Sequence, residues 1–504
     1  MTIGPAAGLL LLLALGCAGA ASADDKAIED VDAGPFSSGA MAIGQAKDVD
    51  HARAEGLGLV PASPLDTYLN GILAKLLAQS PVTGVPARVY VRASGDWAAK
   101  STADANIYVA LGALLRLDNE DEVAALLAHE ASHVVLGHAD ADVVQSAQQR
   151  AVQLSALAVE AQAVVDGARG KGDGGAGKPA AGSARVEEQS RALLLNTMLL
   201  SPAWTREQER DADRLGTDLL VRAGYAPQAM ASLLRKQKTF ETARAASPQA
   251  AAFDKQLLGV DTKQVVQQQA QKAAKNIGVK DPSGLAGLAG SALGGALDWG
   301  SKKVGEAQRS HPKTEERIVE IESYVAEEYS GAAAPALQVE AWDAAKEQDG
   351  TVDILENYIA AIEAKGKLAD GDVAAARKLA KTSLSGPTKA HAYPNFVEAA
   401  VEISAGAPAP ALAAYETALA GPEPAGAIYS EASVLYLETG KRDKAVEVIE
   451  AGYARLQEPP SLTVPLIRTY RLTGRQADAD RVAAQCAARW PGMQGVCMGE
   501  AKGK

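Results

Sequence analysis

The sequence predicts an α+β protein that is mostly helical, with a small sheet in its N-terminal part and helical repeats in its C-terminal third. Three observations lead to this fold class. Only 4% of the 504 residues are aromatic and alanine is abundant, which favours helices over β-sandwich architectures. Two short strand patterns occur between residues 88 and 109. From about residue 332 onwards, alanine-rich helical patterns alternate with regularly spaced glycines.

Length and charge narrow the class of protein. A chain of 504 residues is long enough for two or three domains, and we expect them at 24–330 and 331–504. The formal net charge is −12, from 50 basic and 62 acidic residues, and no basic run of note is present. Nucleic acid is therefore not an expected partner.

The first 23 residues have the pattern of a signal peptide. A short apolar core at 9–15 precedes small residues at 21–23, which form a cleavage site, although no Lys or Arg precedes the core. The alternative is lipidation at Cys17, which follows a sequence similar to a lipoprotein box. We favour simple cleavage near Ala23, and both routes predict export.

Cys486 and Cys497 are close together near the C-terminus. In an exported protein this spacing predicts a disulfide, and the alternative is a pair of free, partly buried thiols.

The N-terminal elements follow from local patterns. Residues 24–62 are polar and lack periodic apolar residues, so we expect an extended lead-in. Apolar residues at helical spacing predict a helix at 66–77. The segments 88–92 and 105–109 are short strand candidates. They either supply a sheet edge on which an extended peptide can pair or form a plain structural hairpin.

An acidic run at 118–122 precedes the next helix. Asp118 or Asn119 can cap this helix, and acidic residues in its first turn complement the helix dipole. We interpret the run as the solvated start of the helix.

The helix continues into the sequence LLAHEASHVVLGHAD, in which His129, Glu130 and His133 form an H-E-x-x-H pattern. Positions i and i+4 lie on one helix face, so both imidazoles can bind one metal ion with the glutamate beside it. The pattern is typical of a zinc hydrolase, in which the carboxylate takes a proton from water. The alternative is a charged helix face that happens to hold two histidines.

His138 follows His133 by five residues, which is about 500° of helix. On a continuous helix it faces away from the two histidines, so we expect a supporting or packing role for His138 and not a zinc ligand. Flexible insertions are expected at about 167–183, where the sequence is glycine-rich and low in complexity, and at about 245–300. Within the second insertion, we interpret the glycine- and alanine-rich stretch 284–300 as a loop or plug over the site and not as a membrane span.

The segment 204–227 supplies a candidate third ligand. Glu209 and Asp213 are spaced i and i+4 on a predicted helix that Gly224 ends. Alone, the segment indicates a charged surface helix. Beside a two-histidine site, one of its carboxylates is a candidate ligand.

The C-terminal third repeats at an interval of 34 residues. Gly406, Gly440 and Gly474 recur at this period, and Gly371 suggests an earlier, degenerate unit. Two further sets of residues follow the same register, Ala411, Ala445 and Ala479 and the pair Tyr436 and Tyr470, and a proline closes each unit at Pro422, Pro459 and Pro491. A period of 34 is typical of tetratricopeptide repeats, and the alternative is an irregular helical bundle.

Several of these segments together resemble the HtpX-like and BepA-like zinc metallopeptidases, which are related to the CAAX prenyl proteases. The matching motifs are ANIYVALGALLRLDNEDEVAALLAHE, HEASH, TREQERDADRLG, AGYAP and Ser310-His311-Pro312, and the resemblance covers roughly 41–329. Ser132 stands where these relatives usually have glycine, and Val109-Ala110-Leu111-Gly112 lacks their proline-glycine pair.

The resemblance implies a zincin-like metallopeptidase domain with one zinc ion per chain. It implies His129, His133 and Glu209 as ligands, Glu130 as general base, and Asp213 as the residue that orients a ligating histidine. His311 matches a histidine that approaches the metal in BepA-like relatives, so it is either a gate and fourth ligand or a packing residue at a helix start.

The expected function is that of an exported zinc endopeptidase in the periplasm of a Gram-negative bacterium, acting on protein or peptide substrates in envelope quality control. The repeats would recruit protein partners, and a peripheral association with the outer membrane stays open. The competing hypothesis is a catalytically latent scaffold or chaperone that uses the peptidase fold for binding. A membrane-embedded peptidase is disfavoured, because no stretch of about 18 strongly apolar residues is present.

Overall fold

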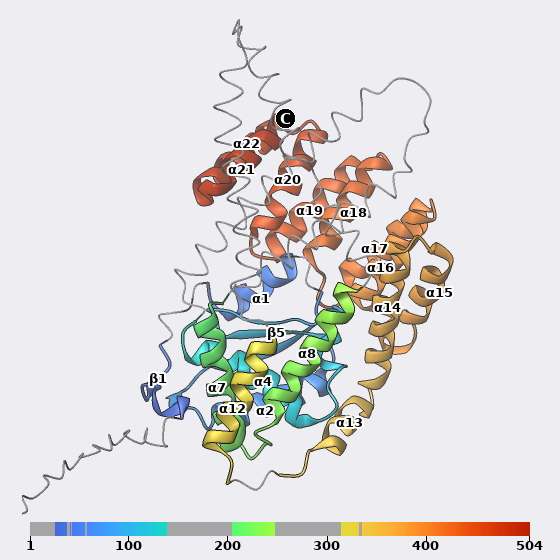
Figure 1. The fold of residues 1–504 in the computed structure, drawn as a ribbon. Coiled ribbons are helices and arrows are strands. Elements are labelled where there is room, and N and C mark those ends of the chain that lie inside the picture. The colour runs from blue at the N-terminus through green and yellow to red at the C-terminus, as the bar shows by residue number, and fades with distance from the viewer. Residues whose placement is uncertain are drawn as a thin grey trace, which may run out of the picture.

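The computed structural model describes residues 26–37, 41, 43–55, 58–138, 204–246, 314–331 and 335–503, and its helices and small sheets confirm the predicted fold class (Figure 1). The predicted signal peptide, Cys17, the insertion at 167–183, nearly all of that at 245–300, and His311 lie outside the described residues. Within these ranges, no helix has both the length and the apolar character needed to cross a membrane.

The N-terminal part alternates short strands with longer helices. Its elements are η1 (Ala27–Glu29), β1 (Gly34–Pro35), α1 (Gln45–Ala54), α2 (Ser63–Leu77), β2 (Val82–Thr83), β3 (Arg88–Arg92), β4 (Ala99–Ser101), β5 (Asn106–Ala110), α3 (Leu111–Leu114), α4 (Glu120–Val135), α7 (Arg206–Arg222), α8 (Ala229–Ala245) and α12 (Thr314–Glu328). The expected helix at 66–77 and both expected strands are present, with bounds that differ by a few residues at most.

The main sheet has the strand order β3-β5-β4. β3 runs parallel to β5, with Tyr90 opposite Tyr108, so the two predicted strands are not the arms of a hairpin. The strand between them in sequence, β4, pairs antiparallel with β5 and places Lys100 opposite Tyr108. Among the described strands β4 has no partner on its outer side. Its three residues are too few for a periodic pattern, which explains why the sequence did not predict it.

The expectation of an extended lead-in at 24–62 was wrong in part, because it contains the helix α1. The residues of α1 are QAKDVDHARA, which have little apolar periodicity. Its buried residues are two alanines and Arg53, and polar contacts hold much of the helix in place. A helix fixed in this way gives no hydrophobic signal in the sequence.

The hydrophobic core of the N-terminal part lies between α2, the sheet and the helices α4, α7 and α8. It also takes in residues beyond the expected boundary at 331, from α13 (Val339–Glu347) and α14 (Val352–Ala369). Trp342 of α13 stacks on Tyr68 and donates a hydrogen bond from Nε1 to the Leu117 carbonyl at 3.0 Å. Tyr358 of α14 is fully buried in the same core.

Most of the acidic run before α4 is buried, so the interpretation of a solvated helix start was wrong for residues 120–122, whereas Asp118 is exposed. Asn119 caps α4 by accepting a bond from Glu122 N at 2.9 Å, as one of the two predicted caps. The three acidic residues that follow are 9%, 0% and 3% exposed. They accept hydrogen bonds from other parts of the chain. Glu120 accepts from the hydroxyls of Tyr68 and Tyr225, Asp121 from the backbone amides of Ala226 and Gln338, and Glu122 from the hydroxyl of Ser232. The carboxylates therefore anchor α4 to its neighbours, because buried charges need such partners.

The C-terminal part is a stack of helices: α15 (Val373–Ser383), η3 (Gly386–Ala390), α16 (Ala392–Ser404), α17 (Pro408–Ala420), α18 (Gly426–Glu438), α19 (Arg442–Arg455), α20 (Pro460–Leu472), α21 (Gln476–Arg489), η4 (Pro491–Met493) and α22 (Gln494–Ala501). The predicted glycines each lie between two helices with φ between 73° and 82°: Gly371, Gly406, Gly440 and Gly474. Only glycine adopts this conformation without a steric cost.

The 34-residue interval also appears in the side-chain contacts. Tyr436 donates to Glu416 at 2.6 Å, and Tyr470, 34 residues later, donates to Glu450 at 2.7 Å. Basic side chains at the matching positions lie over the two rings: Lys441 over Tyr436, and Arg475 over Tyr470. These equivalent contacts indicate repeated helix–turn–helix units and disfavour an irregular bundle.

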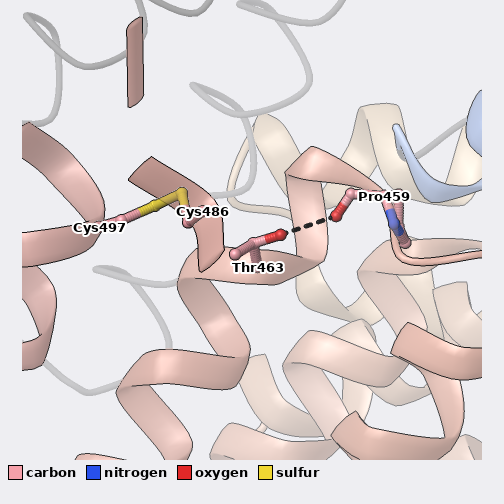
Figure 2. Close-up of a disulfide and its surroundings, with 4 residues drawn as sticks. All are labelled: Pro459, Thr463, Cys486 and Cys497. Carbon is pink, nitrogen blue, oxygen red and sulfur yellow. Dashed lines mark hydrogen bonds between the residues drawn. A yellow bond between two sulfur atoms is a disulfide. The ribbon is translucent and has the colours of Figure 1, made fainter. Parts of the chain in front are cut away.

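The predicted disulfide joins Cys486 of α21 to Cys497 of α22, with the two Cα atoms 6.3 Å apart. Figure 2 shows it close to the start of α20, where the Thr463 hydroxyl donates to the Pro459 carbonyl at 3.1 Å. Both cysteines are buried, so the bridge fastens the last helix onto the repeat core.

Replacing both cysteines by serine should lower the free energy of unfolding of the repeat part by about 2–3 kcal/mol, because the bridge restricts a short loop in the unfolded chain. Denaturant unfolding followed by circular dichroism measures this change. Reduction of the wild-type protein is the control and should produce the same shift. An unchanged midpoint in both experiments would contradict a stabilising bridge.

Candidate metal centre

The helix α4 places three candidate site residues in the protein interior. His129, Glu130 and His133 are 8%, 5% and 0% exposed. The i, i+4 spacing places the Nε2 atoms of His129 and His133 3.2 Å apart. Both imidazoles therefore present a nitrogen to the same point beside Glu130.

The helix α7 approaches α4 closely and adds a carboxylate. At Gly216 a Cβ atom would lie 3.2 Å from the backbone of Ala128 and of His129, so a side chain at this position would force the helices apart. A capping box between Thr205 and Gln208 fixes the start of α7 just before Glu209. The Glu209 Oε2 atom lies 3.6 Å from His129 Nε2.

His129, His133 and Glu209 form a cluster whose ligand atoms all lie within 4.8 Å of one another, and all three residues are buried. Two imidazole nitrogens and one carboxylate oxygen are the donor set of many catalytic zinc sites. The cluster therefore has the composition and compactness needed to hold a metal ion.

The contact on the far side of His129 fits this interpretation. Its Nδ1 atom lies 2.9 Å from Asp213 Oδ1. An ionised carboxylate only accepts, so Nδ1 carries the proton and Nε2 presents a lone pair to the cluster. Burial lowers the pKa of His133 well below its ordinary value, which favours the neutral ring that a metal requires.

Arg317 of α12 completes the centre, and sequence reasoning did not assign it a role. Its Nε and NH2 atoms donate to the two Asp213 oxygens at 2.8 and 2.7 Å, and its NH1 atom lies 2.9 Å from Glu209 Oε2. Burial acts to raise the pKa of Asp213, but the guanidinium outweighs it and holds that pKa below its ordinary value. Asp213 therefore stays ionised beside His129.

The expectation that His138 faces away from the site was wrong. α4 ends at Val135, and Gly137 adopts a φ of 66°, which turns the chain back. His138 N donates to the His133 carbonyl at 3.0 Å, and the two Nδ1 atoms lie 2.9 Å apart. Trp204 stacks on the His133 ring with centroids 4.5 Å apart. His138 and Trp204 therefore hold the His133 ring in its orientation.

Glu130 lies next to the ligand cluster and close to the end of β4. Burial raises the pKa of its carboxyl above the ordinary value, while the neighbouring His129 and the hydroxyl of Ser101 act in the opposite direction. Its Oε2 atom has no hydrogen-bond partner among the described residues. A buried carboxylate oxygen of this kind is suited to accept a proton from a reactant.

His311 lies outside the described residues, three positions before the start of α12 at Thr314. Its assignment as a gate or fourth ligand stays a prediction.

Comparisons with known proteins show which family the N-terminal part matches. The model of Peptidase family M48 matches residues 66–325. The Escherichia coli K12 "Beta-barrel assembly-enhancing protease" is 27% identical over 209 residues, which is 41% of this chain and 40% of the relative. A Yersinia pestis protein of the same name is 28% identical over 34% of this chain and 32% of its own length. The Escherichia coli "Metalloprotease LoiP" is 28% identical over 33% of this chain and 57% of the relative.

The matches therefore confirm the family resemblance, and metallopeptidases of this family depend on zinc. The match spans less than half of the length of the assembly-enhancing proteases.

Arg317→Lys should weaken zinc binding about 10- to 100-fold, because lysine keeps the charge but cannot bridge Asp213 and Glu209 with a planar fork. Competition with a chromogenic zinc chelator measures the dissociation constant. The matched control is Arg206→Lys, which alters an exposed pair with Glu316 and should leave the affinity unchanged. Equal zinc affinity in the folded Arg317→Lys variant and the wild type would contradict the positioning role.

Proposed function

Because the chain belongs to peptidase family M48, we propose that it is a zinc-dependent endopeptidase. One observation carries the proposal: His129, His133 and Glu209 converge within 4.8 Å in the protein interior, directly beside the carboxylate of Glu130. A structural zinc site is commonly closed by a fourth cysteine or histidine, whereas three ligands with an adjacent acid are typical of hydrolytic sites.

In the proposed mechanism His129, His133 and Glu209 hold one zinc ion. Bound zinc supplies Lewis-acid polarisation of the scissile carbonyl and acidifies a water molecule. Asp213 keeps His129 in the tautomer that binds metal, since it accepts from Nδ1. Arg317 prevents Asp213 and Glu209 from repelling each other and fixes both side chains.

Glu130 acts as the general base. Its carboxyl is buried and burial raises its pKa, which makes it a stronger proton acceptor for the attacking water. The same carboxyl then returns the proton to the leaving amine, which allows the peptide bond to break. Such a proton transfer contributes about 10²- to 10⁴-fold to rate.

The strand β4 is the proposed binding edge for the substrate. Its outer side is unpaired among the described strands, and its last residue, Ser101, lies beside Glu130. An extended peptide can add to such an edge through main-chain hydrogen bonds. This arrangement would lay the scissile bond along the site and would select extended or unfolded segments over folded ones.

The repeat part would bind protein partners on its stacked helices, in the manner of tetratricopeptide repeats. The disulfide between Cys486 and Cys497 supports an oxidising compartment, in agreement with the expected export to the periplasm. Two relatives are named for the assembly of β-barrels. We therefore propose quality control of envelope proteins as the biological role, with protein substrates that are not yet folded.

Glu130→Gln should keep zinc but lower the turnover of an unfolded protein such as casein by at least about 10²-fold, because glutamine cannot accept the proton. Zinc content and release of labelled peptides are measured on the same preparation. The matched control is Glu207→Gln, which changes an exposed carboxylate on α7. Undiminished turnover by Glu130→Gln would contradict the mechanism.

Removal of the metal should abolish hydrolysis reversibly. Incubation with 1,10-phenanthroline, followed by dialysis, is expected to stop casein cleavage, and about one equivalent of Zn²⁺ per chain should restore it, because three ligands define a single site. Cleavage that persists in the metal-free protein would exclude a zinc peptidase. Zinc that binds without restoring any cleavage would favour the scaffold or chaperone.

A further inference from the structure

The helix α1 lies between the two parts of the molecule, with the sheet on one side and the repeat helices α18–α20 on the other (Figure 1). Ala52 packs with Leu59 and Tyr108 in a small separate cluster at the sheet, and Ala54 belongs to the core of the repeats. No periodic pattern in the sequence predicts a helix at this position.

On the side of the sheet, Asp48 binds the turn that joins β4 to β5. A single oxygen, Asp48 Oδ2, accepts from Thr102 Oγ1 at 3.1 Å, Asn106 Nδ2 at 2.8 Å and the Tyr108 hydroxyl at 2.8 Å. Thr102 directly follows the last residue of β4, and the other two donors belong to β5. Hydrogen bonds to an ionised acceptor are stronger than those to a neutral one. Asp48 therefore ties the end of β4 to β5 at a fixed distance from α1.

The chain before α1 binds the same turn from its other end. The amides of Ile43 and Gly44 donate to Asp104 Oδ1 at 3.0 and 2.5 Å. Asn106 also donates to the carbonyl of Gln45 at 3.0 Å. The β4–β5 turn is thus held at several points by one short segment.

On the other side, α1 is bound by two loops of the repeat part and by the first turn of α20. In the loop before α18, Arg53 of α1 contacts Glu423 Oε2 at 3.0 Å through Nε and the Pro424 carbonyl at 3.3 Å through NH2. In the loop before α20, Gln457 donates from Nε2 to Asp50 Oδ2 at 2.7 Å, and its carbonyl lies 3.2 Å from His51 Nε2. Ser461 Oγ at the start of α20 donates to the Ala54 carbonyl at 3.0 Å. At Gly426 a Cβ atom would lie 2.2 Å from the Ala54 carbonyl, so the backbones meet directly.

Backbone strain marks both sides of α1. Across the described ranges, the non-glycine residues with positive φ are Ala105 (60°), Glu423 (54°), Gln457 (58°) and Glu458 (57°). Ala105 lies in the β4–β5 turn, Glu423 and Gln457 bind α1 directly, and Glu458 follows Gln457. Residues of this kind persist where surrounding contacts over-determine the backbone, and they concentrate at functional sites.

We propose that α1 is the positioning element of the substrate strand: Asp48 holds β4 in register beside Glu130, and the repeat part holds α1 through Arg53, Asp50 and their partners. The place of the substrate on β4 rests on the proposed function. The mechanical link from the repeats to β4 does not. A change in the repeats that moves α1, such as binding of a protein partner, would thereby alter the binding edge and change substrate affinity without touching the ligands of the metal.

Asp48→Asn tests the link on the side of the sheet. Asparagine has the same shape but a neutral oxygen, so the three hydrogen bonds weaken. The Thr102 amide donates to the Asn106 carbonyl and the Ala110 amide to the Ala98 carbonyl, and hydrogen exchange at both amides should become about tenfold faster. Exchange in α4 should not change and serves as the internal control. Unchanged exchange at both amides would overturn the role of Asp48.

Gln457→Gly and Glu458→Gly test the link on the side of the repeats as a matched pair. Each removes a side chain and relieves a positive φ, but only Gln457 donates to α1, whereas Glu458 pairs with Arg489. Gln457→Gly should accelerate exchange in the β4–β5 connection about threefold and raise the KM for an extended peptide, with kcat and zinc affinity unchanged. Glu458→Gly should match the wild type in every measurement.

The outcomes separate this proposal from the proposed function. Faster exchange in Asp48→Asn and Gln457→Gly, with no peptide cleavage even by the wild type, would support the mechanical link and reject the proposed peptidase activity. Equal effects of Gln457→Gly and Glu458→Gly overturn the link, because strain alone would then explain them. A fall in kcat or zinc affinity without a change in KM also overturns it, since the effect would then lie at the metal and not at the strand.

Discussion

The buried guanidinium of Arg317 holds the candidate metal centre together. It binds Asp213 through two hydrogen bonds and Glu209 through a third contact, and Asp213 in turn lies against His129. Buried charges cost several kcal/mol each unless their partners are well placed. The guanidinium contacts both carboxylates and holds the pKa of Asp213 below its ordinary value. The ligand geometry on α4 and α7 therefore depends on α12, although α12 supplies none of the three clustered ligands.

The rest of the N-terminal part secures these helices relative to one another. Gly216 allows α7 to lie against α4 at His129, and the buried acidic run anchors the start of α4 to three other elements. At the far end, Asp218 of α7 accepts from Tyr324 of α12 at 2.8 Å and from the backbone of Ile28 at 2.9 Å. α7 and α12 are thus joined by polar contacts at both ends, which keeps Arg317 aligned with Asp213.

Local patterns made the helix of the H-E-x-x-H motif and the 34-residue units predictable. His129 and His133 depend on a spacing within one helix, and Gly440 depends on a backbone conformation within one turn. Glu209 needed a family resemblance, because no local rule joins two distant helices. Arg317 gave no local signal of its role, since it stands in a charged helix start and its partners lie about 100 residues away. α1 and β4 were missed because polar contacts and three-residue strands leave no periodic pattern in the sequence.

The central claim is that His129, His133 and Glu209 together bind one zinc ion. Anomalous diffraction from crystals of the zinc-loaded protein, recorded on both sides of the zinc absorption edge, tests it most directly. The account predicts one strong edge-dependent peak per chain, within about 2.0–2.2 Å of both Nε2 atoms and of a Glu209 carboxylate oxygen. A zinc peak that lies elsewhere in the crystal, with none between these three side chains, would contradict it.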